Sequence, residues 1–395
     1  MVLLMEFLSY GKHWIEQDDI DSVVEVLKSE YLTQGPYIKK MEDEICKITQ
    51  AKYCVAVSNG TAALHIAVLA LEIEKKSEAI TSPNTFVASA NCMIYNNLVP
   101  IFADIDKDDY TIDPLEIERK ITDKTKLLIP VHFAGQPAKM KQIQEIANKN
   151  NLFIIEDAAH AIGSFYEDGS PVGNCKYSDL TIFSFHPVKT ITCGEGGAIT
   201  TNSKELYERL LFLRSHGITK DKANFKIQDL EWIGPWFYEM QTLGFNYRIT
   251  DIQAALAVSQ LKKLDRFKTR RQEIVKIYNE AFKKNQNIKT PYERDCVDSC
   301  FHLYILQIDF NKINITRTEV IDRLKCKNIG SQVLYIPVHL QPYYQEIYNY
   351  KLGDYPVSEN YYQNCLALPL YPKMSNDQIQ YVIDIFFESI QQRIL

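Results

Sequence analysis

Between about residues 50 and 200, short apolar runs alternate with segments in which apolar residues recur at helical spacing. The apolar runs predict strands at residues 53–57, 79–82, 99–103, 127–131, 153–156 and 180–184. Helices are predicted to start near Gly60, Thr85, Asp113 and Lys139. In the first of these, Leu64, Ala67, Val68 and Leu71 share one face. This alternation is typical of βαβ units around a mostly parallel sheet that helices cover on both faces.

The pattern changes in the second half of the chain. Thr250-Asp251-Ile252-Gln253 matches a capping box and predicts a long helix that runs to about Phe267 and crosses between domains. Beyond Lys289 the expected elements are strands at residues 302–309 and 331–336, a helix after the cap at residues 316–319, and a last helix from Ser375. These elements predict a small α+β domain.

The length of the chain predicts more than one domain. At 395 residues it exceeds the size at which a single core usually stops growing. We expect residues 1–265 to hold an N-terminal segment and a large α/β domain, and residues 266–395 to form the small domain. Residues 219–247 fit neither pattern. We expect an ordered loop there, because side chains such as Trp232, Trp236, Phe237 and Tyr238 rarely stay in water.

Composition excludes several classes of protein. Lysine and arginine total 44 against 50 acidic residues, which gives a net charge of −6 and argues against a nucleic-acid surface. The nine cysteines include no C-x-x-C pair and no zinc-like spacing, so we expect reduced thiols and no metal. Residues 1–5 are apolar but too short for a signal or a membrane span, and Met5 could be the natural start. We expect a cytoplasmic protein without membrane contact.

Two residues at the ends of predicted strands point to a specific chemistry. Asp157 follows the apolar run of residues 152–155, and Lys189 ends Ser-Phe-His-Pro-Val-Lys at residues 184–189. A lysine can hold pyridoxal phosphate as a Schiff base, while an acid keeps the pyridine nitrogen protonated so that the ring acts as an electron sink. Few other charges surround Lys189, so we expect it to be enclosed, with a lowered pKa that keeps the amine nucleophilic. Asp157 alone could equally cap a helix.

A phosphate site is predicted at residues 58–62, Ser-Asn-Gly-Thr-Ala, between a strand and a helix. Small residues there leave the backbone N–H groups of the helix start free to bind an anion, although Asn59 could be an ordinary N-cap. Ser184 is placed to add a hydroxyl. His160 could reach the ring's phenolic oxygen or be a structural histidine. Asn246 could complete the phosphate site of a second chain if the protein dimerises.

Together these segments resemble the DegT/DnrJ/EryC1/StrS family of sugar aminotransferases, within the fold-type I pyridoxal phosphate enzymes. The resemblance covers essentially the whole chain, in blocks at residues 32–36, 58–62, 84–91, 157–163, 184–189, 195–197 and 244–248. It implies that Lys189 is the Schiff-base and catalytic lysine and that Asp157 binds the pyridine nitrogen. The other implied cofactor contacts are Phe86 and Ala159 on the two ring faces, Gly60, Thr61 and Ser184 at the phosphate, and Asn246 from the partner in a homodimer.

The segment of residues 184–189 is also similar to the aminotransferases of pseudaminic acid synthesis. That similarity implies a UDP-linked 2-acetamido-2,6-dideoxy-4-hexulose as substrate, L-glutamate as amino donor and 2-oxoglutarate as product. Residues 335–340 resemble the broader family, so dTDP- or GDP-linked 4-keto-6-deoxyhexoses stay alternatives. A sugar dehydratase is less favoured, because some family members that dehydrate sugars have a histidine in place of the lysine. A non-catalytic cofactor sensor is less favoured because the chain shows no DNA-binding segment and its net charge is negative. The expected substrate contacts are Tyr10, Tyr31, Thr33, His186, Gln332 and Tyr335.

Overall fold

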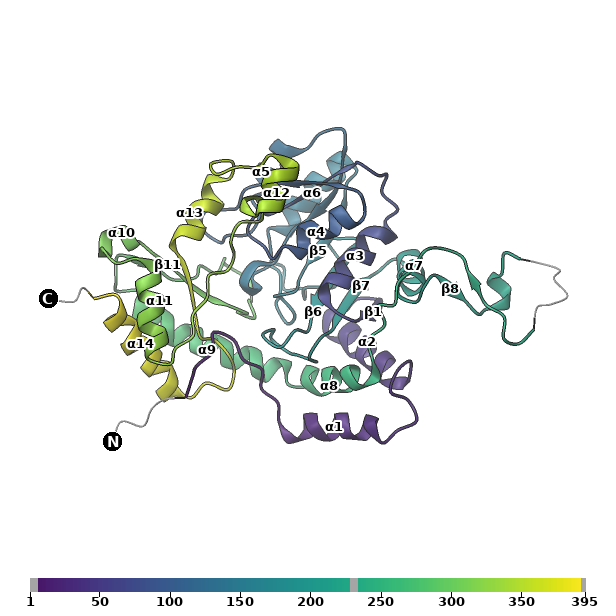
Figure 1. Cartoon of the computed structure of the whole chain (residues 1–395), viewed down its shortest axis with the longest axis horizontal. Helices are drawn as coiled ribbons and strands as arrows, with labels where there is room; N and C mark the ends of the chain where they lie inside the picture. The colour runs from purple at the N-terminus through teal and green to yellow at the C-terminus, as the bar shows by residue number, and fades with distance from the viewer. Residues whose placement is uncertain (1–5, 228–233, 392–395) are drawn as a thin grey trace.

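The computed structural model describes residues 6–227 and 234–391 (Figure 1). Its centre is a sheet of seven strands in the order β1-β7-β6-β5-β4-β2-β3. The strands are β1 Tyr53–Val57, β2 Glu78–Thr81, β3 Val99–Phe102, β4 Thr125–Ile129, β5 Phe153–Asp157, β6 Leu180–Ser184 and β7 Gly197–Thr201. β7 pairs antiparallel with β1 and β6, and the other pairs are parallel. The predicted mostly parallel sheet is therefore confirmed.

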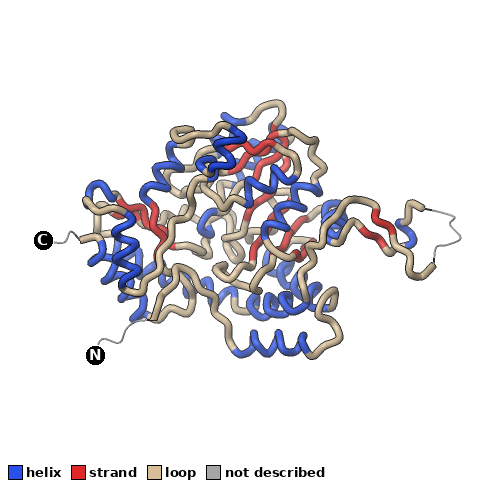
Figure 2. Tube along the Cα trace, viewed as in Figure 1, coloured by secondary structure: helices blue, strands red, loops and turns tan. Residues whose placement is uncertain are grey.

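Helices cover both faces of this sheet because its strands are apolar on both sides (Figure 2). Along β1, Cys54 and Ala56 face one core while Val55 and Val57 face the other. The first core packs against α2 Pro36–Thr49, α5 Pro114–Lys120, α6 Met140–Asn150 and α8 Asp251–Leu261. The second packs against α3 Gly60–Ala70, α4 Ala88–Tyr95 and α7 Lys204–Arg214. α3 is buried beyond the one predicted face, because α4 and α7 also lie against it.

The long helix predicted to run from Thr250 to Phe267 is two helices. The Thr250 capping box opens α8 as expected, but α8 ends at Leu261 and α9 Leu264–Phe282 follows. At the break, Lys263 donates its backbone N–H to Gln260, three residues back, and its side chain binds Asp18 and Asp19. α9 contributes residues to the first core and to a separate C-terminal core, so the connection between the two halves is helical as predicted.

The C-terminal core lies between a small sheet and several helices. The sheet holds β10 Ile288–Lys289, β11 Tyr304–Ile308 and β12 Cys365–Leu368, all antiparallel. The helices that pack in this core are α9, α10 Phe310–Ile313, α11 Arg317–Cys326 and α14 Asn376–Ser389. α12 Pro342–Tyr348 and α13 Pro356–Asn364 pack in two smaller apolar clusters instead. Thr316 and Ser375 cap α11 and α14 as predicted. Leu8, from the N-terminal segment, also packs in this core. The domain boundary at residues 265 and 266 stays a prediction.

The predicted strand at residues 331–336 is wrong. Only Gln332 pairs with another strand, in a single bridge to Ala367. Further along, the carbonyl of Leu334 accepts a hydrogen bond from the Tyr361 hydroxyl at 2.6 Å. The side chains of Leu334 and Tyr335 pack in an apolar cluster between the two halves of the chain. Side-chain contacts hold the segment in place of a ladder of backbone hydrogen bonds between strands. Residues 331–336 therefore form an irregular segment, which we call the C-terminal strap.

Residues 218–227 and 234–243 belong to an arm that projects from the body of the molecule (Figure 1). Its base is the antiparallel pair β8 Ile218–Thr219 and β9 Glu239–Met240. Phe225 and Phe237 pack against each other, but Trp236 is 76% exposed and Tyr238 is 54% exposed. The expectation that these aromatic side chains are shielded from water is wrong within one chain. Trp232 and residues 1–5 lie outside the described residues.

α1 Gln17–Leu27 lies along α8 and completes the helical layer there. No helix in residues 6–227 and 234–391 has both the length and the apolar character that a membrane span needs.

Candidate active site

A cavity of about 810 Å³ lies at the carboxyl edge of the large sheet. The segments that follow β1, β2, β4, β5 and β6 all reach it, because these strands run in the same direction. β7 runs the opposite way, and Glu195, just before it, reaches the same edge. The N-terminal segment and the C-terminal strap close the cavity with Tyr10, Leu334 and Tyr335. The sequence thus folds so that residues far apart in the chain face one space.

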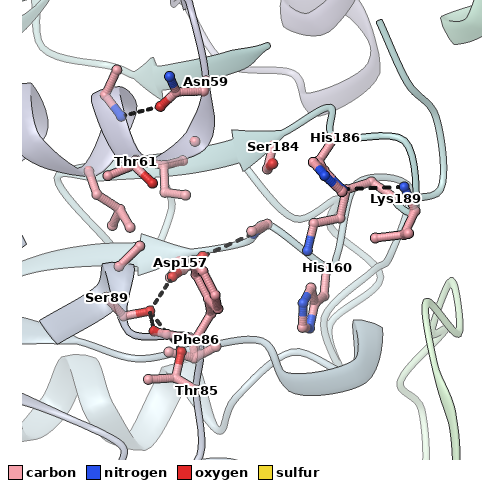
Figure 3. Close-up of a pocket in the computed structure, with 18 of the residues that line it drawn as sticks. Asn59, Thr61, Thr85, Phe86, Ser89, Asp157, His160, Ser184, His186 and Lys189 are labelled. Atoms are coloured by element: carbon pink, nitrogen blue, oxygen red, sulfur yellow. Dashed lines mark hydrogen bonds between the residues drawn. The ribbon is translucent and has the colours of Figure 1, made fainter. Parts of the chain in front are cut away.

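Asp157, the last residue of β5, is held in a fixed orientation at this edge (Figure 3). It is only 5% exposed. One carboxylate oxygen accepts a hydrogen bond from the Ser89 hydroxyl at 2.6 Å, and the other accepts from the Ala159 N–H at 3.1 Å. Ser89 in turn lies 2.7 Å from the Thr85 hydroxyl. These bonds orient an anion toward the cavity, where it can hold a proton on a ring nitrogen.

Lys189 follows β6 in the same cavity (Figure 3). Burial lowers the pKa of its amine to about 8, while the charge of Asp157 acts in the opposite direction. A pKa near 8 leaves about a tenth of the amine neutral at pH 7, compared with less than a thousandth for an ordinary lysine. The amine can therefore act as a nucleophile and carry protons at neutral pH. The predicted enclosure and lowered pKa of Lys189 agree with this geometry.

The start of α3 forms a cradle for an anion. Asn59 caps the helix by accepting a hydrogen bond from the Ala62 N–H at 2.8 Å, as the alternative interpretation expected. In the described part of the chain, the N–H groups of Gly60 and Thr61 and the hydroxyls of Thr61 and Ser184 have no hydrogen-bond partner. A Cβ atom on Gly60 would lie 2.9 Å from the Cβ of Ser184, so only glycine allows β6 to approach this closely. These donors fit a phosphate group at a helix N-terminus.

Aromatic groups line the opposite wall. Phe86 is 58% exposed, so its ring face is free to stack on a flat ligand. The Nε2 atom of His160 lies 3.1 Å from the Tyr335 hydroxyl. Burial, followed by the charge of Lys189, holds the pKa of His160 well below its usual range. Burial raises the pKa of Tyr335, so both groups are neutral at pH 7.

Comparison with known proteins agrees with this geometry. The family model described as the DegT/DnrJ/EryC1/StrS aminotransferase family matches residues 13–387. The chain belongs to this aminotransferase family. The spore coat polysaccharide biosynthesis protein SpsC of Bacillus subtilis is 41% identical over 379 residues, which are 96% of each chain. The resemblance inferred from the sequence is thereby confirmed.

Solved structures of aminotransferases share the fold. The aminotransferase PseC of Helicobacter pylori, involved in the biosynthesis of pseudaminic acid, superposes with a TM-score of 0.89 at 29% identity, over 98% of this chain and 99% of that one. The putative sugar aminotransferase Spr1654 of Streptococcus pneumoniae, solved in a pyridoxal phosphate form, gives a TM-score of 0.88 at 28% identity, over 97% and 98% of the chains. The same protein is also solved in a pyridoxamine phosphate form. The chain is accordingly a sugar aminotransferase of this family.

Most of the predicted site residues share the cavity in this family member. The residues that line it are Tyr10, Gly60, Thr61, Phe86, Asp157, Ala159, His160, Ser184, His186, Lys189 and Tyr335. Four others do not line the cavity of their own chain: Tyr31, Thr33, Gln332 and Asn246. All four are exposed; Gln332 bridges Ala367 and Asn246 bridges Ser215 at the base of the arm. The roles given to all these residues stay predictions.

Several residues that line the cavity were not predicted from the sequence. Ser89 is the most important of these, because its hydroxyl donates a hydrogen bond to Asp157. It lies in the block at residues 84–91 that resembles the family, but no role was predicted for it. Tyr95 and Tyr247 also line the cavity. Tyr247 is next to Asn246 in the sequence. The turn that was predicted to reach the site of a neighbouring chain therefore also contributes a residue to the cavity of its own chain.

Proposed function

We propose that this aminotransferase transfers the amino group of L-glutamate to the C4 ketone of a nucleotide-linked 4-keto-6-deoxy sugar. The best candidate is UDP-2-acetamido-2,6-dideoxy-4-hexulose, and dTDP- and GDP-linked sugars are the alternatives. The observation that carries the proposal is Lys189, with a pKa of about 8, in the same cavity as the oriented anion Asp157. The fold likeness to PseC supports the choice of sugar. A lysine at this position speaks against a sugar dehydratase.

Pyridoxal 5′-phosphate fits the side chains that line the cavity. Gly60, Thr61 and Ser184 present unpaired donors for its phosphate, and Asp157 presents an anion for its ring nitrogen. Phe86 would stack on one face of the ring. Once bound, the cofactor supplies an electron sink for the carbon that loses or gains a proton. Lys189 would hold it covalently through Nζ.

The chain's own residues then divide the work of transamination. The Lys189 amine takes the α-proton of glutamate and later delivers a proton to C4 of the sugar, acting as general base and general acid. Asp157 keeps the ring nitrogen protonated, and Ser89 keeps Asp157 from turning away. The net exchange converts glutamate to 2-oxoglutarate and the sugar ketone to an amine.

The test is an amine-transfer assay with a panel of sugars. The holoenzyme is incubated with ¹⁵N-labelled L-glutamate and with UDP-, dTDP- or GDP-linked 4-keto-6-deoxy sugars, and products are identified by mass. We expect one nucleotide sugar to gain ¹⁵N while 2-oxoglutarate accumulates in equal amount. Loss of water from the sugar without uptake of ¹⁵N would favour a dehydratase instead.

We also propose that the protein acts as a homodimer with shared active sites. Trp236, Tyr238 and Met240 all lie on the arm within five residues of one another, and each is more than half exposed. Monomeric proteins rarely leave such a patch in water, so a second copy of the chain is its expected cover. Asn246, at the base of this arm, does not line its own cavity and would reach the phosphate site of the partner.

Shared sites predict that two inactive variants complement each other. Lys189→Ala removes the amine, and Asn246→Asp places an anion beside the partner's phosphate site. Each variant alone is expected to be inactive. After mixing and subunit exchange, half of the dimers are hybrids with one intact site, so activity should recover to about a quarter of wild type. Dual-tag purification confirms the exchange. Hybrids that form but stay inactive would contradict shared sites.

A further inference from the structure

A chain of hydrogen bonds fixes the direction of one proton at the cavity wall. The Ala134 N–H donates to Nδ1 of His160 at 3.3 Å, so Nδ1 carries no hydrogen. The single ring proton of neutral His160 therefore lies on Nε2, which is 3.1 Å from the Tyr335 oxygen. That oxygen accepts the bond, and the hydroxyl hydrogen of Tyr335 must point elsewhere.

The free hydrogen of Tyr335 points toward the cavity. Tyr335 lines this space, and His160 is the only hydrogen-bond partner of its hydroxyl among residues 6–227 and 234–391. Its ring is held between neighbours: the centroid of Phe86 lies 6.2 Å away and that of Phe133 lies 6.3 Å away. The phenol is thus a neutral donor without an acceptor among the described residues. Tyr335 is half-buried and faces the cavity, where a ligand atom can accept its hydrogen.

We propose that the Tyr335 hydroxyl donates a hydrogen bond to the ketone oxygen of the sugar, with His160 as the residue that positions it. This inference rests on the proposed function. A neutral donor among aromatic rings suits an uncharged carbonyl oxygen, whereas the carboxylates of glutamate favour a charged donor. The bond polarises the carbonyl for attack by the amine. The oxygen then leaves as water with the two hydrogens of the amine, and Tyr335 keeps its own proton.

Transamination has two half-reactions, one with glutamate and one with the keto sugar. Measuring them separately distinguishes a role in binding the ketone from a general structural role. In Tyr335→Phe, the bleaching of the visible absorbance by L-glutamate should stay within about threefold of wild type, because glutamate does not use this donor. Return of the absorbance on adding the keto sugar should slow by about tenfold or more. His160→Leu should share this selective loss, and His160→Gln, which keeps an N–H donor, should restore part of it.

A binding measurement gives a readout independent of turnover. The probe is UDP-N-acetylglucosamine, which carries a hydroxyl where the substrate has its ketone, titrated into the apo protein by calorimetry. Tyr335→Phe should weaken its binding by about tenfold. The matched control is Tyr344→Phe, because the buried Tyr344 hydroxyl binds Asn91 outside this cavity. That variant should bind and react like wild type.

The outcomes distinguish this inference from the proposed function. Equal losses in both half-reactions, or no loss in either, would overturn the role of Tyr335 while transamination itself stands. Unchanged probe affinity in Tyr335→Phe would overturn it as well. A wild-type protein that does not respond to glutamate would instead overturn the proposed function, and this inference with it.

Discussion

Replacing Lys189 by methionine is expected to abolish transamination. The variant keeps the length of the side chain but removes the amine that holds the cofactor and moves both protons, so the rate should fall by about 10⁴-fold or more. Steady-state assays with glutamate and the keto sugar measure this loss. Pyridoxal phosphate should still bind through the phosphate cradle, but without covalent attachment. Turnover at the wild-type rate in Lys189→Met would contradict the role of Lys189.

The same substitution is expected to stabilise the apo protein. The pKa of Lys189 is about 8 in the folded chain and about 10.4 when unfolded, so folding below pH 8 is penalised by a desolvated charge. Between pH 8 and 10.4 the unfolded chain binds more protons, and wild-type stability rises. Lys189→Met should therefore be more stable by about 1–3 kcal/mol at pH 7, with a gap that closes above pH 10. Urea unfolding at several pH values measures it.

Lys263 provides the matched control, because it is a buried lysine with partners. It binds Asp18 at 2.6 Å and Asp19 at 2.7 Å, and these carboxylates help to raise its pKa. Its charge stabilises the folded state, and this contribution fades only as pH rises past the raised pKa. Lys263→Met should therefore destabilise the protein at pH 7. If both methionine variants shift stability in the same direction, burial of the Lys189 charge is not the cause.

Asp157→Asn is expected to have the second largest effect. The amide can keep the hydrogen bond with the Ala159 N–H, but it carries no charge to hold a proton on the ring nitrogen. Loss of a pre-oriented charge at a reacting centre costs about 10²–10³-fold in rate. We expect kcat to fall by that factor while the protein keeps its fold. Single-turnover kinetics with glutamate measure the step.

Asp104 is the control for losing a buried carboxylate. It is 6% exposed and accepts the N–H groups of Val357 and Ser358 at 2.9 Å, at the start of α13 and away from the active-site cavity. Asp104→Asn should lower the melting temperature and leave kcat within about threefold of wild type. If Asp157→Asn likewise lowers the melting temperature and leaves kcat nearly unchanged, the Asp157 carboxylate has no chemical role.

The sheet was largely predictable because buried parallel strands are continuous apolar runs. All six predicted strands of the sheet are present; two match residue for residue, and the other four differ by one or two residues at their ends. β7 was missed, because Gly197–Thr201 follows a glycine turn and its apolar run is only two residues long, Ala198 and Ile199. The segment at residues 331–336 has β-branched residues, but its neighbours bind it through side chains, which local sequence does not encode.

The site residues that belong to short sequence motifs could be predicted from the sequence. Lys189 and Asp157 follow strand ends, and the direction of the sheet brings such ends together. Ser89 was missed because its contact with Asp157 joins residues 68 positions apart, and a serine within a helix carries no distinct signal. The bond between His160 and Tyr335 spans 175 positions. Such pairings depend on tertiary packing, and so does the place of Tyr31, Thr33 and Gln332 outside the cavity.

The visible absorbance spectrum of the purified protein shows whether Lys189 holds pyridoxal phosphate covalently. The spectrum is recorded with pyridoxal phosphate and again after L-glutamate is added, with Lys189→Met as the control. We predict a visible band that wild type holds through dialysis and that glutamate bleaches, and no such retained band in the variant. A wild-type protein without this band, even after cofactor is added, would contradict the role given to Lys189 and Asp157.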